Sequence, residues 1–300
     1  MKRYDYGMLL NDLEMLMSNG AVRAEVLTTS ILGRKIPLIR MGEGKKKVLY
    51  VGAHHGAESV SAAVLMDFAA EYLRLQKSGG AVFEQKVPVL FSHREILLVP
   101  MLNPDGVEYS VNGPGADNPL LSRVTGMNGG SGDFTRWQAN ARGVDLNHNY
   151  DAGFGKYKAM EEKEGIPCGA PTRYSGEYPE SEPESAALCR LIRAERSDLL
   201  GVLTLHTQGE EIYSSCGQHL SAKCLSAGRI LQRMTGYELK NPVGLAAFGG
   251  LTDWCIEALD LPSFTVECGR GENPLPAETR PLIYEKLRRA LFAFPFFFAK

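Results

Sequence analysis

The chain has 300 residues, of which 44% are hydrophobic and 23% are charged, and its formal net charge at pH 7 is −2. A chain of this length and balance can bury a large core, and it lacks the strongly basic composition of nucleic-acid-binding proteins. Its six cysteines are scattered without a CxxC pair, no apolar run is long enough to span a bilayer, and the N-terminus lacks a secretory pattern. We therefore expect a cytoplasmic protein with reduced thiols and with no nucleic-acid or membrane partner.

The predicted elements alternate between helices and strands along the chain. In order, they are a helix over about 4–19, a strand over 47–52, a helix over 59–76, a strand over 95–101, a helix over 182–196, a strand over 199–206, a helix over 221–235, a short helix over 253–261, a strand over 263–267 and a helix over 277–292. The stretch 103–169 is rich in glycine and asparagine, and we expect functional loops there. The alternation predicts one α/β domain over 1–300, with a mixed, largely parallel twisted sheet, helices on both faces and no separate wall-binding module.

The C-terminal segment "ALFAFPFFFAK" is strongly aromatic. Pro295 interrupts it, and the segment is too short to cross a membrane. We expect its rings to pack on the core of the chain, or on a second copy in a homo-oligomer.

Side chains with metal-binding chemistry follow two of the predicted strands. The stretch "AHHGAE" (53–58) comes directly after the first strand, and His206 ends the strand over 199–206. Ligands of open α/β sheets bind beyond the carboxyl ends of the strands, so these groups are expected to converge. Two imidazoles and one carboxylate are the ligand set of a catalytic zinc that keeps its fourth position for water. We predict one Zn²⁺ per chain, held by Glu58, His206 and one histidine of the pair His54 and His55, with the spacing to Glu58 favouring His55.

A zinc hydrolase also needs a general base. Glu267 ends the predicted strand over 263–267, in the apolar context "FTVECG". Desolvation there would raise the pKa of the carboxyl and let it take a proton from water. The alternative is a strand-end carboxylate paired with an arginine.

Seven short motifs occur in an order that resembles the zinc carboxypeptidases. They are "HHGAE" (54–58), "NPDG" (103–106), "RGVDLNHNY" (142–150), "SEPE" (181–184), "LH" (205–206), "GGLTDW" (249–254) and "TVECG" (265–269). The segment "GRGENPLP" (269–276) further resembles the branch of γ-D-glutamyl-meso-diaminopimelate peptidases, which cut bacterial cell-wall peptides. The similarity covers nearly the whole chain.

The resemblance implies roles for several side chains. Zinc would lie on His55, Glu58 and His206, and Glu267 would be the general base. An arginine would polarise the scissile carbonyl; Arg142 in "ANARGVDLN" is the predicted residue, and Arg136 in "FTRWQ" is the alternative. Asn147 resembles the family residue that hydrogen-bonds the terminal carboxylate of the substrate.

Two positions depart from the digestive carboxypeptidases in ways that bear on the substrate. His148 stands where those enzymes carry an arginine, and an imidazole is a weaker, pH-dependent clamp for a carboxylate. Thr252 stands where a large apolar or an acidic residue would select aromatic or basic side chains. A small hydroxyl suits neither, but it is compatible with the polar, zwitterionic side chain of diaminopimelate.

The predicted function is zinc-dependent hydrolysis of the γ-D-glutamyl-meso-diaminopimelate bond in muropeptides, with a peptide or muropeptide as partner. Alternatives within the same fold are a general zinc carboxypeptidase and a zinc amidohydrolase acting on small acylated amino acids. A cysteine hydrolase using Cys268 with His206 would leave "HxxE" without a role. A zinc- or peptide-binding module without activity would have no need of Glu267.

Overall fold

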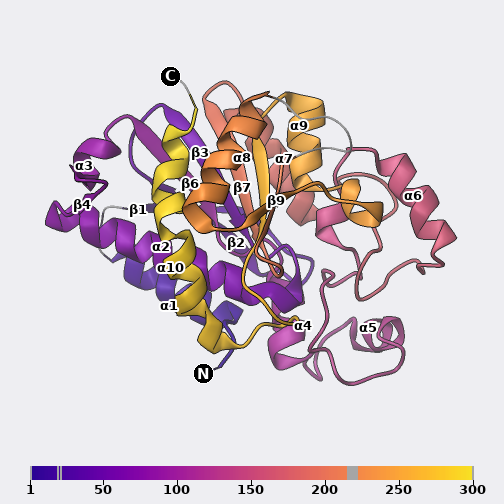
Figure 1. Cartoon of the computed structure of the whole chain (residues 1–300). Helices are drawn as coiled ribbons and strands as arrows, with labels where there is room; N and C mark the ends of the chain where they lie inside the picture. The colour runs from indigo at the N-terminus through magenta and orange to yellow at the C-terminus, as the bar shows by residue number, and fades with distance from the viewer. Residues whose placement is uncertain (1, 19, 21, 215–221, 299–300) are drawn as a thin grey trace.

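The computed structural model describes residues 2–18, 20, 22–214 and 222–298. Its centre is an eight-stranded sheet with the strand order β1-β2-β6-β3-β7-β10-β8-β9 (Figure 1). The strands are β1 (Val22–Thr29), β2 (Lys35–Met41), β3 (Lys46–Gly52), β6 (Arg94–Val99), β7 (Leu199–His206), β8 (Glu211–Tyr213), β9 (Glu238–Lys240) and β10 (Ser263–Glu267). The four central strands β6, β3, β7 and β10 run parallel, whereas β1, β2 and β8 add antiparallel pairings. The predicted mixed, largely parallel sheet is confirmed.

Helices cover both faces of this sheet, as predicted. One core contains residues of α1 (Tyr6–Met17), α2 (Ser59–Ser78), α8 (Ala222–Thr235) and α10 (Arg280–Ala293), and the other contains residues of α7 (Pro183–Glu195) and α9 (Leu251–Leu259). Alternate side chains of β3 enter the two cores: Val48 and Tyr50 face the first, Leu49 and Val51 the second. A strand buried on both faces has no polar face, which explains why β3 is a continuous apolar run in the sequence.

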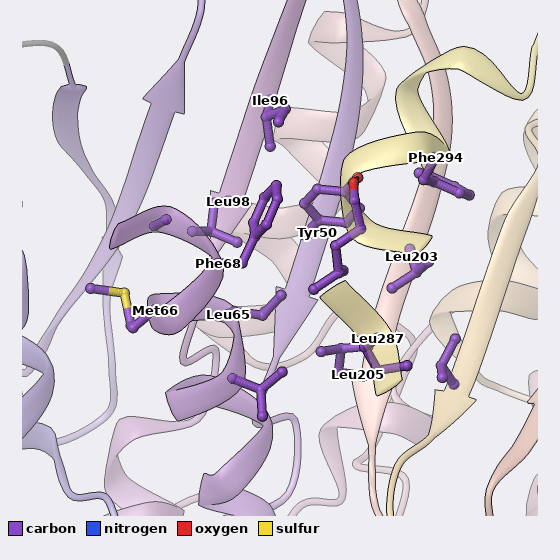
Figure 2. Close-up of a cluster of buried hydrophobic side chains, with 14 of the residues drawn as sticks. Tyr50, Leu65, Met66, Phe68, Ile96, Leu98, Leu203, Leu205, Leu287 and Phe294 are labelled. Carbon is purple, nitrogen blue, oxygen red and sulfur yellow. The ribbon is translucent and has the colours of Figure 1, made fainter. Parts of the chain in front are cut away.

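The C-terminal aromatic segment packs on the first core, as expected. Figure 2 shows Phe294 close to Tyr50 in the cluster that α2 and α10 build against the sheet. The Phe294 ring lies 5.8 Å from that of Tyr50 and 5.8 Å from that of Phe264, measured between centroids. The Tyr50 hydroxyl donates to the carbonyl of Leu291 at 2.7 Å, so the ring anchors the end of α10 to the central sheet.

The stretch 103–169 differs from the predicted loops, because it contains helices. They are α4 (Pro104–Asn112), α5 (Leu121–Met127), the single turn η2 (Leu146–His148) and α6 (Phe154–Lys163). Asn103 begins α4, since its Oδ1 accepts the N–H of Gly106 at 2.9 Å and proline occupies the first helical position. These helices are short, and their apolar residues are too few to produce a clear helical period.

The remaining elements are short. They are the ribbon of β4 (Ala81–Val82) and β5 (Gln85–Lys86), the helix α3 (Val87–Leu90), and the single turns η1 (Gly56–Glu58), η3 (Gly244–Ala247), η4 (Ala277–Thr279) and η5 (Phe294–Phe296). None of the five described cysteines forms a disulfide, and Cys216 lies outside the described residues. In the described part of the chain, no helix combines the length and the apolar character that a membrane span requires.

Candidate active site

The first functional segment is the turn between β3 and α2. Ala53 adopts a positive φ of 46°, and η1 leads directly into α2. Ser61 closes the turn, because its hydroxyl accepts the N–H of Ala53 at 2.9 Å and donates to the carbonyl of Glu58 at 2.7 Å. This bracing holds His55 and Glu58 beyond the carboxyl end of β3.

His55, Glu58 and His206 converge on one point. Nδ1 of His55 lies 2.9 Å from Oε1 of Glu58, and Nδ1 of His206 lies 3.2 Å from Oε2 of the same carboxylate. The two Nδ1 atoms are 3.3 Å apart. One ligand atom from each residue lies within 4.8 Å of the other two, so the structure brings the predicted ligands together.

The geometry of this triad fits a zinc ion. Ligand atoms at about 2.0–2.1 Å from a tetrahedral zinc are roughly 3.3–3.4 Å apart, which matches the distance between the two imidazole nitrogens. Two nitrogens and one carboxylate also form the three-ligand set of catalytic zinc sites, in which the fourth position stays open. The donor set and its spacing therefore suit a catalytic rather than a structural zinc.

The charges at the triad favour a bound cation. Burial disfavours an imidazolium, but the negative charges of Glu58 and Asp145 outweigh it and hold the pKa of His55 well above its ordinary value. Burial likewise disfavours an ionised Glu58, yet the positive charge of His55 and hydrogen bonds from both histidines lower the pKa of Glu58 to about 2. A bound cation would take over the positive charge that a proton on His55 supplies here.

Asp145 positions His55 from the far side of the ring. Its Oδ1 lies 3.0 Å from Nε2 of His55, and the carboxylate also accepts the backbone N–H groups of Asn147 at 3.2 Å and Arg173 at 2.9 Å. A carboxylate on the distal nitrogen directs Nδ1 towards a metal and raises its basicity. The sequence analysis missed this role, although Asp145 lies within the motif "RGVDLNHNY".

Asn273, in the segment "GRGENPLP", supports Glu58. Its Nδ2 donates to the carbonyl of Thr207 at 2.7 Å and lies 3.3 Å from Oε1 of Glu58. The hydroxyl of Thr207 donates to Oδ1 of Asn273 at 2.7 Å, and the N–H of Thr207 donates to Oε2 of Glu58 at 3.1 Å. The sequence pointed to this segment through its resemblance, but it did not single out Asn273.

His54 lies behind the triad. Its Nε2 is 3.0 Å from the hydroxyl of Tyr150, its Nδ1 is 3.2 Å from the hydroxyl of Thr204, and its ring stacks on His206 with 5.1 Å between centroids. Burial lowers the pKa of His54 well below its ordinary value, which keeps the imidazole neutral. Both ring nitrogens are engaged away from Glu58, which supports His55 as the ligand of the pair.

Glu267 ends β10, in register with His206 on β7. Burial, together with the negative charge of Glu58, raises the pKa of Glu267 well above its ordinary value, as the sequence predicted from its apolar context. Among the described residues, no arginine forms an ion pair with it. The carboxyl therefore has the environment of a proton acceptor rather than that of a structural ion pair.

Cys268 faces the opposite side of β10. Its side chain is fully buried in the first core, and burial raises the pKa of the thiol well above its ordinary value. A buried, protonated thiol cannot act as a nucleophile towards a substrate in the site. This placement disfavours the cysteine-hydrolase alternative.

A cleft of about 350 Å³ opens beside His55. It is lined by His55, Gln138, Asp145, His148, Glu164, Thr172, Arg173, Val243, Leu245 and Ala246. His148 enters this lining with its Nδ1 already 3.0 Å from the carbonyl of Phe248 and its ring stacked on Tyr157 at 4.3 Å. The neighbouring Asn147 accepts the N–H of Leu251 at 3.4 Å.

The two arginines predicted to polarise the carbonyl are not among the residues that line this cleft. Arg136 is exposed and pairs with Glu272 at 2.8 Å, and the nearest guanidinium nitrogen of Arg142 is 3.8 Å from Glu182. The catalytic role predicted for either arginine stays a prediction.

Thr252 is buried on α9. Its hydroxyl lies 2.8 Å from that of Thr265 and 3.3 Å from that of Ser263. Thr265 shares a face of β10 with Glu267, so the three hydroxyls form a small polar layer behind that carboxyl. A direct contact between Thr252 and a substrate stays a prediction.

Two cleft residues, Gln138 and Arg173, were not predicted. Oε1 of Gln138 accepts the hydroxyl of Thr172 at 2.5 Å, and its backbone carbonyl accepts the N–H of Gly56 at 2.9 Å. Arg173 shares the cleft with it. Neither follows a predicted strand, so the sequence carried no signal for either.

The chain is similar to known proteins over most of its length. A sequence profile of the zinc carboxypeptidases matches residues 9–289. The chain is 32% identical over 287 residues to γ-D-glutamyl-L-diamino acid endopeptidase 1 of Lysinibacillus sphaericus. The matched region covers 95% of this chain and 70% of that protein. It is 24% identical over 262 residues to carboxypeptidase B of Bos taurus, covering 82% and 57% of the two chains. Its fold matches carboxypeptidase A of Helicoverpa armigera with a TM-score of 0.75 at 21% identity, covering 98% and 73%.

Proposed function

The chain belongs to the zinc carboxypeptidase family, and from this premise we propose that it hydrolyses the bond between γ-D-glutamate and meso-diaminopimelate in cell-wall muropeptides. The observation that carries the proposal is the 32% identity, over 95% of the chain, with a γ-D-glutamyl-L-diamino acid endopeptidase. The contact of Asn273 with Glu58 adds support, because it ties the branch-like segment "GRGENPLP" to the triad.

His55, Glu58 and His206 would hold the zinc that this family uses. Zinc, once bound, supplies a Lewis acid that lowers the pKa of water and polarises a carbonyl. Asp145 fixes the ring of His55 and Asn273 fixes the carboxylate of Glu58, so the protein keeps the ligand atoms in place.

We assign proton transfer to Glu267. Its carboxylate would accept a proton from the attacking water and pass it to the nitrogen of the leaving diaminopimelate. A raised pKa favours both halves of this task, because the carboxylate takes the proton more readily and holds it until the amine departs.

Substrate contacts follow from the cleft. The side-chain amide of Gln138 is the donor that we assign to the scissile carbonyl, because it lines the cleft whereas Arg142 and Arg136 do not. Asn147 is assigned to a substrate carboxylate, with His148 beside it. Thr252 contributes to the polar layer behind Glu267.

The experiment is hydrolysis of a substrate panel by zinc-loaded protein, with products identified by mass. L-Alanyl-γ-D-glutamyl-meso-diaminopimelate should be cleaved well between glutamate and diaminopimelate. The lysine-containing tripeptide, which lacks the distal carboxylate, should be cleaved less well. Hippuryl-phenylalanine and hippuryl-arginine should be poor substrates, because a polar site rejects ligands that leave its groups unpaired.

A general zinc carboxypeptidase is the second candidate, favoured by the similarity to carboxypeptidase B. Faster hydrolysis of hippuryl-phenylalanine than of the muropeptide would establish that candidate and end the γ-glutamyl proposal. Cleavage of small acylated amino acids alone would point to an amidohydrolase.

A further inference from the structure

Arg173 is the one lysine or arginine among the described residues that line the cleft. The other charged or titratable lining residues are His55, Asp145, His148 and Glu164. A peptide that enters the cleft therefore meets a single permanent positive charge contributed by the protein itself.

The backbone of Arg173 is held by Asp145, the carboxylate that contacts His55 of the triad. Its N–H donates to Oδ2 of Asp145 at 2.9 Å, and its carbonyl accepts the hydroxyl of Tyr157 at 2.8 Å. The residue is held at a φ of +67°, a conformation that non-glycine residues rarely adopt. The same carboxylate orients His55, so the root of the Arg173 side chain stays at a constant distance from the predicted metal ligand.

The guanidinium of Arg173 is available to a ligand. Its side chain is 59% exposed, and within the described part of the chain its one ion pair joins Nη1 to Oε2 of Glu164 at 3.5 Å, with Glu164 46% exposed. Exposed pairs of this kind contribute little to stability, and a substrate carboxylate can replace the glutamate. A guanidinium can then bind that carboxylate through two parallel hydrogen bonds.

His148 does not provide this charge. Burial lowers its pKa, despite the nearby negative charge of Asp145. With Nδ1 facing the carbonyl of Phe248 and the ring stacked on Tyr157, the neutral imidazole is fixed in place. The cleft therefore lacks a cation at position 148 and carries one at position 173.

We propose that Arg173 selects the substrate by binding a carboxylate next to the scissile bond. This deepens the proposed function and rests on it. In a γ-D-glutamyl-diaminopimelate peptide the γ-linkage leaves the α-carboxylate of D-glutamate free on the acyl side, and diaminopimelate carries carboxylates on the leaving side. Both sources offer the same chemistry, and the test distinguishes them.

The test compares wild type with Arg173→Gln and Arg173→Lys on three tripeptides. One is L-alanyl-γ-D-glutamyl-meso-diaminopimelate, the second carries an amide at the α-carboxyl of glutamate, and the third carries amides on diaminopimelate. Wild type should prefer the carboxylate over one of the amides by roughly tenfold to a hundredfold in kcat/KM. Arg173→Gln should bring that ratio close to one, mainly through KM, and Arg173→Lys should keep part of it. The amide for which the preference collapses identifies the carboxylate.

Arg74→Gln is the control, because Arg74 is also exposed and also pairs with one glutamate, Glu71, but lies on α2 outside the cleft. It should keep the wild-type ratios. Calorimetric binding of the same peptides to zinc-free protein gives a readout that does not depend on turnover, and Arg173→Gln should weaken binding of the carboxylate form there too.

Unchanged ratios and unchanged binding in Arg173→Gln would overturn the role of Arg173 while leaving the proposed function intact. If wild type cleaves only hippuryl-phenylalanine, the γ-glutamyl proposal fails. In that case the role of Arg173 is tested by comparing kcat/KM of wild type and Arg173→Gln on hippuryl-phenylalanine and on its C-terminal amide.

Discussion

Glu267 and Cys268 are neighbours in the sequence, but they face opposite sides of the sheet. Side chains alternate along β10, so the carboxyl reaches the predicted metal site while the thiol enters the first core. The sequence left two mechanisms open at this strand end, with Glu267 as general base or Cys268 as nucleophile. Because the two side chains face opposite ways, that of Glu267 lies on the side of the predicted metal site and that of Cys268 does not.

We expect Glu267→Gln to retain zinc and to lose turnover by roughly a hundredfold or more, because glutamine keeps the size of the side chain but cannot accept a proton. Metal content and kcat, measured on the same preparation, check this. Cys268→Ser should leave turnover nearly unchanged, and the reverse pattern would favour a cysteine hydrolase.

Glu184 gives a prediction for the pH dependence of stability. Burial is the main cause that raises its pKa from 4.5 to about 8, and the negative charge of Glu182 adds to it. The folded protein thus holds a proton that the unfolded chain loses above about pH 4.5. The stabilising contribution is complete below pH 4.5 and is lost as the pH rises towards 8.

Between pH 5 and pH 8.5 the wild-type free energy of unfolding should therefore fall, relative to that of Glu184→Gln, by on the order of a few kcal/mol. Glutamine resembles the protonated carboxyl and does not titrate. The contributions of the other titratable groups to the pH dependence are therefore the same in both proteins and cancel in the comparison. Denaturant titrations at the two pH values measure the difference. Parallel pH curves for the two proteins would show that Glu184 is ionised in the folded state.

At the scale of elements, the turn η1 determines the geometry of the ligands. It packs closely on α4, because a Cβ added at Gly56 would lie 2.2 Å from the carbonyl oxygen of Gly106 and 2.7 Å from that of Trp137. Both are backbone atoms, which cannot move aside as a flexible side chain would.

Gly56→Ala should therefore displace η1 and with it His55 and Glu58. We expect a loss of roughly 1–3 kcal/mol in the free energy of unfolding and at least about a tenfold loss in zinc affinity. Chelator competition measures the affinity. Gly155→Ala on α6 is the control, since an added Cβ there meets no atom within 4 Å, and it should leave zinc affinity unchanged.

At the scale of the whole molecule, zinc would join η1 to β7. A ligand that binds only the folded state stabilises it by about 4 kcal/mol at a thousand times its Kd. Removal of zinc by a chelator should therefore lower Tm by about 5–10 °C, and added zinc should restore it.

His206→Ala should remain folded, lose most of its zinc and show no response of Tm to the chelator. A wild type that is fully active without metal would contradict the zinc mechanism. Because one domain is predicted, the zinc-loaded and the zinc-free wild type should each show a single thermal transition. Two separate transitions would contradict the predicted domain organisation.

Much of the central sheet could be read from the sequence. The strands over 199–206 and 263–267 were predicted with the bounds that the structure gives them, because strands buried on both faces are short, continuous apolar runs. The strands β1, β2, β8 and β9 at the two sides of the sheet were missed, and so were the helices within 103–169. Their apolar residues are interrupted by charged or small ones, so they lack a clear period.

The sequence by itself determined the α/β fold, the likeness to zinc carboxypeptidases and the positions of His55, Glu58, His206 and Glu267. Each of these four residues lies at or just after the end of a predicted strand and within a short motif. Such local patterns can be read from the sequence alone. Only the tertiary structure decided which side chains complete the site. Asp145, Arg173 and Gln138 reach it from irregular segments whose direction depends on contacts distant in sequence.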